Sequence, residues 1–216
     1  MQSMDLSRLL SKNSPLSDPK AAFSIGYGLY VATTREDGKD SGLVINTFSQ
    51  IGSKPDLFAV GIQKANFSKD VILRTGKINV NVLDMTTPFS LISRFGFQSG
   101  RTTDKMKGLV YGRSENNLPI ILSHTNAYFS LSVKGYVETA SHVLFLCTAE
   151  ESAVLSNEKS LTYAYYHEAL KPKKKIEKSG FVCKICGYVH ESDTLPDNFL
   201  CPICKHPATD FERITR

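Results

Sequence analysis

Four cysteines are crowded into the last 36 residues of this 216-residue chain, with the spacing Cys183-x2-Cys186-x14-Cys201-x2-Cys204. Each CxxC pair can present two thiolates from one tight turn. Two such turns build a tetrahedral cage that suits zinc or a single iron ion. A segment of this length rarely folds without a metal, disulfides or a partner. The spacing therefore predicts that metal binding supplies most of the folding free energy of residues 181–216.

A short basic segment, KPKKKIEKSG over residues 171–180, precedes the cysteines. It contains five lysines, one glutamate, a proline and a glycine, and it has no apolar periodicity, so it is predicted to be a linker. A nuclear-localisation signal is the less favoured interpretation of PKKK. This segment carries nearly all of the net charge of +5, so no basic face for nucleic acid is expected. The predicted domains are residues 1–170 and 181–216, joined by this linker.

No uninterrupted apolar stretch approaches the roughly 18 residues needed to cross a bilayer. The opening residues, MQSMDLSRLLSKNSP, lack the apolar core of a secretory signal. We therefore expect a cytoplasmic protein without membrane contact. In such a protein, two CxxC pairs indicate a metal site rather than disulfides.

Residues from about 25 to 148 contain short runs rich in β-branched and aromatic residues, bounded by Gly, Pro, Asn and Asp. This pattern predicts a mainly β fold, most naturally a barrel. The alternation of apolar residues with Asn79 and Asn81 predicts a half-buried strand. Asp37-Gly38 predicts a hairpin turn, because glycine accepts the positive φ of a tight turn. The predicted strands lie in YGLYVATT, SGLVINTFS, DLFAVGIQ, INVNVLD, FSLSVKGYVE and HVLFLCTAE.

A few peripheral helices are expected. In FSKDVILRTG, Ser68 is predicted to cap the N-terminus and Gly76 to end the helix. Near the end of the first domain, Tyr165, Tyr166 and His167 are expected to pack the last helix onto the barrel. The four helical segments are DLSRLLSK (5–12), FSKDVILRTG (67–76), PFSLISRFG (88–96) and LTYAYYHEAL (161–170).

The C-terminal segment, FVCKICGYVHESDTLPDNFLCPICKHPATDFE, resembles a rubredoxin. The matches are CGY after the first cysteine pair, LPDNFLCPIC at the second pair, and the closing DFE. The 14-residue interval is similar to the rubredoxin-type tails of rubrerythrins. The resemblance implies one iron ion on the four cysteines, although zinc fits the same ligands and can replace iron in recombinant protein. The aromatic core of the family corresponds here to Phe181, Tyr188, Phe199 and Phe211.

Two histidines and a lysine lie close to the cysteines in the sequence. His190 and His206 are predicted to be surface histidines rather than ligands, because four cysteines already complete the set. Lys205 stands where rubredoxins usually have a glycine in a left-handed conformation, so a side chain there costs energy unless the turn relaxes. This departure affects the expected redox potential of the metal ion, but it does not change the predicted set of four cysteine ligands.

Residues from about 24 to 170 resemble the flavin reductase-like proteins, in which FMN sits in a split β-barrel. The resemblance rests on GLYVATT, on GLVINTFSQIGSKPDLFAVGIQKANFSKDVILRTGKINVNVL and on FGFQSGRTTDK. With the rubredoxin-like tail, this domain order is similar to the high-molecular-weight rubredoxins of anaerobic bacteria. Family members usually pair two barrels with FMN at the interface, so a homodimer is expected. A Rossmann domain is not expected, because no complete G-x-G-x-x-G motif is present.

Lys64, Asn66 and Ser68 form K-x-N-x-S just before a predicted helix. A cation, an amide and a hydroxyl beside free helical N–H groups make a phosphate seat, but an ordinary capped helix fits the spacing equally well. The resemblance implies that these residues hold the FMN phosphate. The NTFSQ stretch would otherwise be a polar loop, and Asp104-Lys105 a surface ion pair. The FMN-binding residues that the resemblance implies are Thr33, Asn46, Thr47, Ser49, Gln50, Lys64, Asn66, Ser68, Ser99, Arg101, Asp104 and Lys105.

The two centres together predict an electron-transfer flavoprotein. FMN accepts two electrons as a hydride and releases them singly, whereas an iron–thiolate centre carries one at a time. NAD(P)H or a reductase is the expected donor, and the resemblance implies a flavodiiron protein or a rubrerythrin as the acceptor. Two alternatives remain: a flavin or ferric reductase with an incidental tail, and a binding module with a structural zinc knuckle. No catalytic side chain is predicted, and Cys147 is expected to be a buried core thiol.

Overall fold

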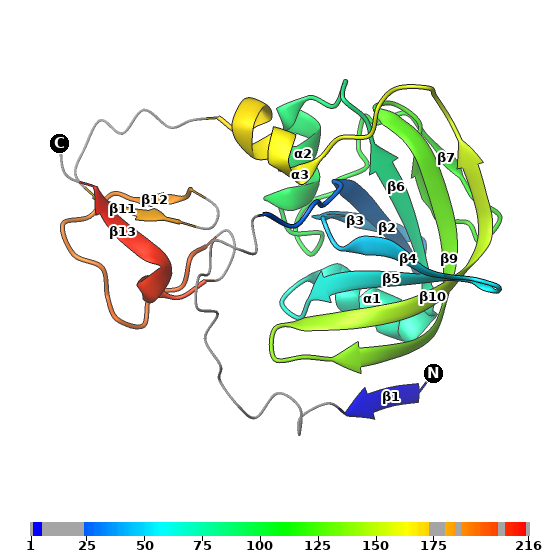
Figure 1. The fold of residues 1–216 in the computed structure, drawn as a ribbon, viewed down its shortest axis with the longest axis horizontal. Coiled ribbons are helices and arrows are strands. Elements are labelled where there is room, and N and C mark those ends of the chain that lie inside the picture. The colour runs from blue at the N-terminus through cyan, green and yellow to red at the C-terminus, as the bar shows by residue number, and fades with distance from the viewer. Residues whose placement is uncertain (1, 6–23, 173–179, 185–186, 203–205, 215–216) are drawn as a thin grey trace. The chain divides into compact units, whose positions relative to one another are not determined.

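The computed structural model describes residues 2–5, 24–172, 180–184, 187–202 and 206–214. The chain divides into two compact units, residues 1–171 and 172–216 (Figure 1). The first unit is mainly β, and the second is a small three-stranded unit.

A curved sheet forms the first unit. Its strands follow the order β3-β2-β6-β9-β10-β5-β4, and β1 pairs with β9 in parallel. The edge strands β3 and β4 leave the barrel open, so the predicted split barrel is confirmed. All six strand-like runs of the sequence are strands. The strands are β1 (Gln2–Asp5), β2 (Tyr30–Glu36), β3 (Lys39–Ile45), β4 (Phe48–Ser53), β5 (Asp56–Gln63), β6 (Lys77–Leu83), β9 (Thr125–Glu138) and β10 (His142–Val154).

The turn between β2 and β3 is the predicted hairpin. Asp37 and Gly38 have φ values of 50° and 76°, and Glu36 pairs with Lys39. Positive φ at both central residues matches the right-handed twist of the two strands. This turn sets the register that pairs Thr34 with Ser41.

The helices lie at the periphery, as expected. They are α1 (Phe67–Thr75), α2 (Phe89–Gly96) and α3 (Tyr163–Tyr165), which continues into the π-helix η2 (Tyr166–Leu170). Gly76 ends α1 with a φ of 66°. The predicted cap was wrong: Asn66 is the N-cap residue, and Ser68 lies buried inside the first turn. The expected helix over 5–12 lies outside the described residues, except for Asp5, which ends β1.

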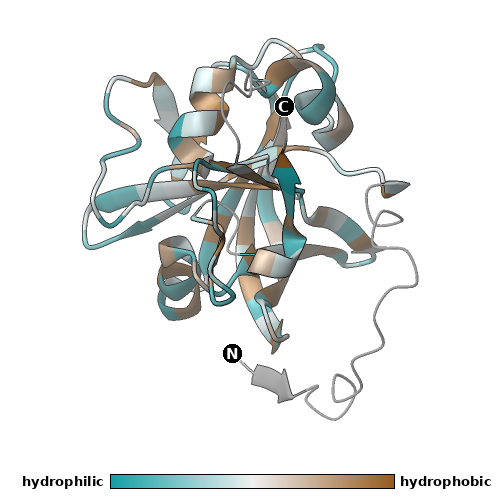
Figure 2. Ribbon diagram, turned by 90° about the vertical axis from the view of Figure 1, so that its left-hand side faces the viewer, coloured by the Kyte–Doolittle hydropathy of each residue, from teal (hydrophilic) through white to brown (hydrophobic). Residues whose placement is uncertain are grey.

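Two hydrophobic cores lie on opposite faces of β2, because neighbouring residues of a strand point to opposite sides. Ala32 belongs to the inner core, which Ile72 of α1 joins. Val31 belongs to the outer core, which Phe95 of α2 joins. Figure 1 shows α1 and α2 on the two sides of these strands, and Figure 2 shows apolar and hydrophilic stretches alternating along the strands of the sheet. The β2–β3 hairpin therefore separates the inner core from the outer core.

The outer face of β6 is not half-exposed, which corrects the prediction. Asn79 and Asn81 are both 0% exposed, because a second hairpin, β7 (Tyr111–Arg113) and β8 (Pro119–Ile121), covers them. The Asn79 side-chain amide donates to Ser114 Oγ over 2.8 Å, and Asn81 Oδ1 accepts from the Ile121 N–H over 2.9 Å. Buried amides need such partners. The two asparagines therefore fix where the second hairpin docks.

The small unit contains β11 (Gly180–Cys183), β12 (Val189–His190), the 3-10 helix η3 (Ala208–Asp210) and β13 (Phe211–Ile214), with the strand order β12-β11-β13. The Phe199 ring lies 5.3 Å from that of Phe211 and 4.5 Å from that of His190. Across the described residues of the chain, no helix is long and apolar enough to span a membrane.

Candidate functional site

The N-terminus of α1 follows β5 after a three-residue connection. Its first backbone N–H groups have no partner within the helix, and together with the helix dipole they favour an anion. The side chain of the N-cap residue, Asn66, makes no capping hydrogen bond. This end of the helix is therefore open to an outside acceptor.

Three hydroxyl side chains lie buried near this end of α1. Ser41 Oγ is 3.5 Å from Ser68 Oγ, and Ser41 pairs with Thr34 across the β2–β3 hairpin. Thr34 is 0% exposed, and its hydroxyl has no hydrogen-bond partner among the described residues. A buried hydroxyl left unpaired costs about 1–3 kcal/mol. These three hydroxyls fit an oxygen-rich anion at the end of the helix.

The segment from Ser99 to Arg101 lies over the same place. A Cβ atom on Gly100 would be 2.3 Å from Ser41 Oγ, so a side chain there would displace the Ser41 hydroxyl or the segment itself. The Arg101 guanidinium lies 5.0 Å from the centroid of the Phe67 ring in the first turn of α1. Ser68, Ser99 and Arg101 of the predicted set are thus brought together. Thr34 and Ser41 were missed because only the strand register places them here, and Gly100 was missed because only the folded chain brings it against Ser41.

Other members of the predicted set lie elsewhere in the barrel unit. The Lys64 ammonium pairs with the Glu138 carboxylate over 2.8 Å, rather than with the end of α1. Gln50 donates to Asp56 over 2.9 Å on the β4–β5 hairpin, and Ser49 is exposed on β4. The Thr47 hydroxyl donates to Asn46 Oδ1 over 3.2 Å. Whether these residues contact a flavin stays a prediction.

Thr33, Asp104 and Lys105 belong to the outer face. The Thr33 hydroxyl donates to the Pro119 carbonyl over 2.6 Å. Lys105 is only 4% exposed and donates to the carbonyls of Gly42 (2.8 Å) and Phe95 (2.9 Å), so it ties α2 to β3. Burial lowers the pKa of Lys105 to about 8. The interpretation of Asp104-Lys105 as a surface ion pair was wrong, because Asp104 instead accepts from the Met106 N–H.

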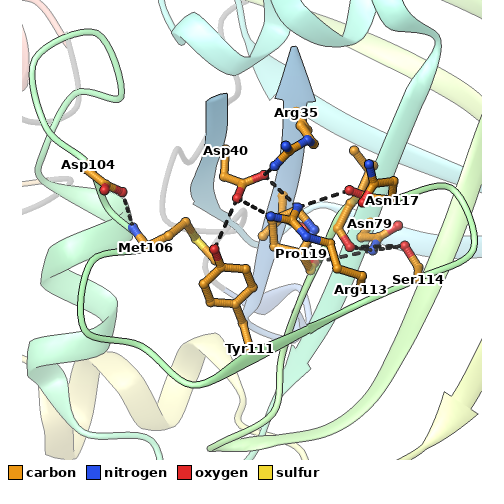
Figure 3. A network of polar contacts seen from close by, with 12 residues as sticks. Arg35, Asp40, Asn79, Asp104, Met106, Tyr111, Arg113, Ser114, Asn117 and Pro119 are labelled. Atoms are coloured by element: carbon orange, nitrogen blue, oxygen red, sulfur yellow. Dashed lines mark hydrogen bonds and ion pairs between the residues drawn. The ribbon is translucent and has the colours of Figure 1, made fainter. Parts of the chain in front are cut away.

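An ion-pair network fastens the β7–β8 hairpin to β2 and β3 (Figure 3). The Asp40 side chain is 9% exposed; it accepts hydrogen bonds from Arg113 (2.7 and 2.8 Å), Arg35 (2.8 Å) and the Tyr111 hydroxyl (3.3 Å). Burial opposes ionisation of this carboxyl, but hydrogen bonds from Arg113 and Arg35 outweigh it and hold its pKa below 3.8. Asp40 is therefore ionised at neutral pH, and it is shared by two guanidinium groups.

We expect Asp40→Asn to lower the free energy of unfolding by about 2 kcal/mol, because it removes charged hydrogen bonds and leaves two arginines without their carboxylate. The melting temperature at pH 7 should fall by about 4–8 °C. Since the Asp40 pKa is lowered in the folded state, its contribution is fully present above the ordinary pKa of 3.8 and is lost progressively as the pH falls from there through the lower pKa of the folded protein. The difference in melting temperature between Asp40→Asn and the unaltered protein should therefore shrink as the pH is lowered from 7 toward 3. The matched control is Asp37→Asn in the same hairpin, which should leave the melting temperature nearly unchanged. Equal melting temperatures for Asp40→Asn and the unaltered protein would contradict the role of Asp40.

The structure describes two of the four cysteines of the predicted metal site. Cys183, at the end of β11, and Cys201 are both buried, while Cys186, Cys204 and Lys205 lie outside the described residues. The Gly187 N–H donates to the Cys183 carbonyl over 2.8 Å, and Gly187 has a φ of 72°. This is the tight left-handed turn that a CxxC knuckle needs. Two buried sulfur donors within a CxxC-x14-CxxC sequence fit a single tetrahedral metal ion.

Comparisons with known proteins agree with this architecture. Residues 22–174 match the flavin reductase like domain, and residues 181–212 match the rubrerythrin, rubredoxin-like domain. The chain therefore belongs to the flavin reductase-like family and carries a rubredoxin-like domain at its C-terminus.

Individual relatives define the class further. The high molecular weight rubredoxin of Moorella thermoacetica is 33% identical over 91% of this chain and 100% of its own length. The NAD(P)H ferric-chelate reductase of Archaeoglobus fulgidus is 33% identical over 72% of this chain and 92% of its own length. Flavoredoxin from Methanosarcina acetivorans has a TM-score of 0.58 at 16% identity, over 65% of this chain and 75% of that one, and supports the fold alone. The protein is an oxidoreductase of flavin-linked electron transfer, and the two domains support FMN and an iron centre.

Proposed function

We propose that this protein passes electrons from NAD(P)H, or from a reductase, through FMN in the barrel to an Fe(Cys)4 centre in the tail. A soluble acceptor then takes them from the iron. One observation carries the proposal: a flavin reductase-like domain and a rubredoxin-like domain are joined in one chain, in the same order as in a relative matched over its whole length.

The residues at the end of α1 support a seat for the FMN phosphate. The first N–H groups of the helix and the hydroxyls of Ser41, Ser68 and Thr34 would bind phosphate oxygens. Arg101 would close over them from the surface, where its guanidinium already stacks on Phe67. When bound, FMN accepts an electron pair as a hydride and gives up the electrons one at a time. The barrel residues hold and orient this group, and none of them needs to react.

In the tail, Cys183, Cys186, Cys201 and Cys204 would hold the iron ion. A thiolate cage fits both valence states with little rearrangement, which suits one-electron exchange. Burial of Cys183 and Cys201 keeps water away from two of the sulfurs, and burial and solvent access tune the potential of such a centre.

The proposal extends to the setting of the protein. We infer a homodimer in the cytoplasm of an anaerobe, with a flavodiiron protein or a rubrerythrin as the acceptor. The resemblance to high-molecular-weight rubredoxins supports this setting, since family members pair their barrels around FMN.

Anaerobic expression with added iron tests the proposal. The purified protein should show a yellow flavin and a red species that dithionite bleaches, with one iron and one FMN per chain. NAD(P)H should reduce the flavin first and the iron second in stopped-flow spectra. Stoichiometric zinc without iron would contradict the relay and favour a structural knuckle.

A second function is favoured by the match to a ferric-chelate reductase over 92% of that protein's length. In that case the barrel reduces free flavin or ferric chelates, and the tail is incidental. Deletion of residues 181–216 separates the two functions. The relay requires that the truncated chain still accept electrons from NAD(P)H but lose transfer to the acceptor protein, whereas unchanged transfer would favour the reductase.

A further inference from the structure

One carboxylate lies beside the proposed phosphate seat. Asp70 is in the first turn of α1, two residues after Ser68. One of its oxygens accepts a hydrogen bond from the Lys69 ammonium, and the other lies 3.6 Å from the Arg101 guanidinium. A negative charge in the first turn stabilises the helix dipole. The same charge opposes any anionic ligand that binds at this end of the helix.

The groups at this end of α1 form two layers. The inner layer consists of the three hydroxyl residues of the proposed seat, which are at most 3% exposed. The outer layer, or rim, consists of Lys69, Asp70 and Arg101, whose side chains are 17%, 34% and 60% exposed. A phosphate that is bound to the inner hydroxyls therefore has the charged rim on its solvent side.

The two common flavin nucleotides place different demands on this rim. FMN ends in one phosphate, whereas in FAD that phosphate carries a second phosphate and an adenosine. The phosphate of FMN would fill the inner layer, and Arg101 would close over it. The second phosphate of FAD would then lie at the rim. There it would meet Asp70 and Lys69, a carboxylate and an ammonium that are already paired with each other.

We propose that Asp70 determines which flavin the seat accepts, because its carboxylate admits a monophosphate in the inner layer and disfavours a second phosphate at the rim. The inference rests on the phosphate seat of the proposed function. Asp70 acts by repelling the second phosphate and by occupying Lys69, which would otherwise bind it. Specificity then comes from a repulsive element as well as from attractive contacts.

A purely structural role for Asp70 has a different signature. If the carboxylate only stabilised α1, its loss would weaken the binding of FMN and FAD by the same factor. If it only held Arg101 in place for the first phosphate, its loss would again affect both flavins, because both carry that phosphate. A selective role changes the ratio of the two dissociation constants in favour of FAD.

Titration of the full-length, metal-loaded protein, freed of flavin, with FMN, FAD and riboflavin tests the role of Asp70. The unaltered protein should bind FMN about tenfold more tightly than FAD, or better. Asp70→Asn keeps the size of the side chain and removes its charge. In this variant the ratio of the FAD to the FMN dissociation constant should fall by about fivefold or more, and this effect should shrink at high salt. Binding of riboflavin, which has no phosphate, should not change.

Glu36→Gln is the matched control. Glu36 pairs with Arg74 in the last turn of the same helix over 2.6 Å, so this variant removes a carboxylate from an ion pair at the other end of α1. Its ratio of dissociation constants should equal that of the unaltered protein. Two results would overturn the role of Asp70: equal or tighter binding of FAD by the unaltered protein, and an unchanged ratio in Asp70→Asn.

Riboflavin separates this inference from the proposed function. If the unaltered protein bound riboflavin as tightly as FMN, the phosphate seat would be wrong, and the role of Asp70 would be wrong with it. A clear preference for FMN over riboflavin, together with an unchanged ratio in Asp70→Asn, would contradict the role of Asp70 alone. Neither result depends on electron transfer, because only binding is measured.

Discussion

Replacement of Cys201 by serine is expected to abolish the metal centre and to unfold residues 181–216, while the barrel unit stays intact. Cys201 is fully buried, and a serine hydroxyl does not replace a thiolate ligand. Metal binding in comparable small zinc sites supplies about 10–16 kcal/mol of folding free energy. The aromatic contacts around Phe199 are too few to hold a segment of this size without it.

Metal analysis and hydrogen exchange measure this outcome. The Cys201→Ser variant should lose stoichiometric metal and the slow exchange of amides in β11 and β13, and it should reduce the acceptor no faster than the truncated chain. Cys147→Ala is the matched control, because burial in β10 raises the pKa of the Cys147 thiol to about 12 and keeps it protonated. Its metal content should not change. A Cys201→Ser variant with full iron and a protected tail would refute a four-cysteine site.

Replacement of Gly100 by alanine should weaken FMN binding by about 10- to 100-fold. The new Cβ would lie 2.3 Å from Ser41 Oγ, so either the Ser41 hydroxyl or the segment over the end of α1 must move, and both belong to the proposed phosphate seat. Such overpacking costs about 1–3 kcal/mol, which corresponds to that range of affinity. Quenching of FMN fluorescence during titration of the apoprotein gives the dissociation constant directly.

Three further variants make this result specific. Gly26→Ala has no atom within 4 Å of the new Cβ, and it should bind FMN as the unaltered protein does. Ser41→Ala alone should weaken FMN binding through the lost hydroxyl. In the Ser41→Ala background, Gly100→Ala meets only contacts of 3.5 Å and should cause little further loss of affinity. Unaltered FMN affinity in Gly100→Ala would show that the phosphate lies away from α1.

Local features of this chain could be predicted from sequence because the residues that decide them are neighbours. The Asp37-Gly38 turn, the Gly76 helix end and the six strand-like runs depend on backbone preferences within a few residues. The four-cysteine metal site stays a prediction of the same local kind, since CxxC spacing alone places two sulfurs on one turn. The family resemblance extended this local knowledge to two whole domains.

Predictions failed where a distant segment covers a residue. The alternation in β6 correctly indicated a strand, but it did not reveal that the β7–β8 hairpin buries Asn79 and Asn81. Lys105 looked like half of a surface ion pair, yet it lies between two carbonyls that belong to β3 and α2. In each case the partner is more than 30 residues away or on another element, and no local pattern carries that information.

The sequence by itself determined the mainly β barrel, the two-domain order and the cysteine spacing that predicts a metal site, because periodicity, turn residues and CxxC motifs act over short stretches of chain. Only the tertiary structure decided that Thr34, Ser41 and Gly100 meet at the end of α1, and that Asp40 lies between Arg35 and Arg113. The physical reason is strand register: a shift of one residue would turn Ser41 away from α1 and Asp40 away from its arginines.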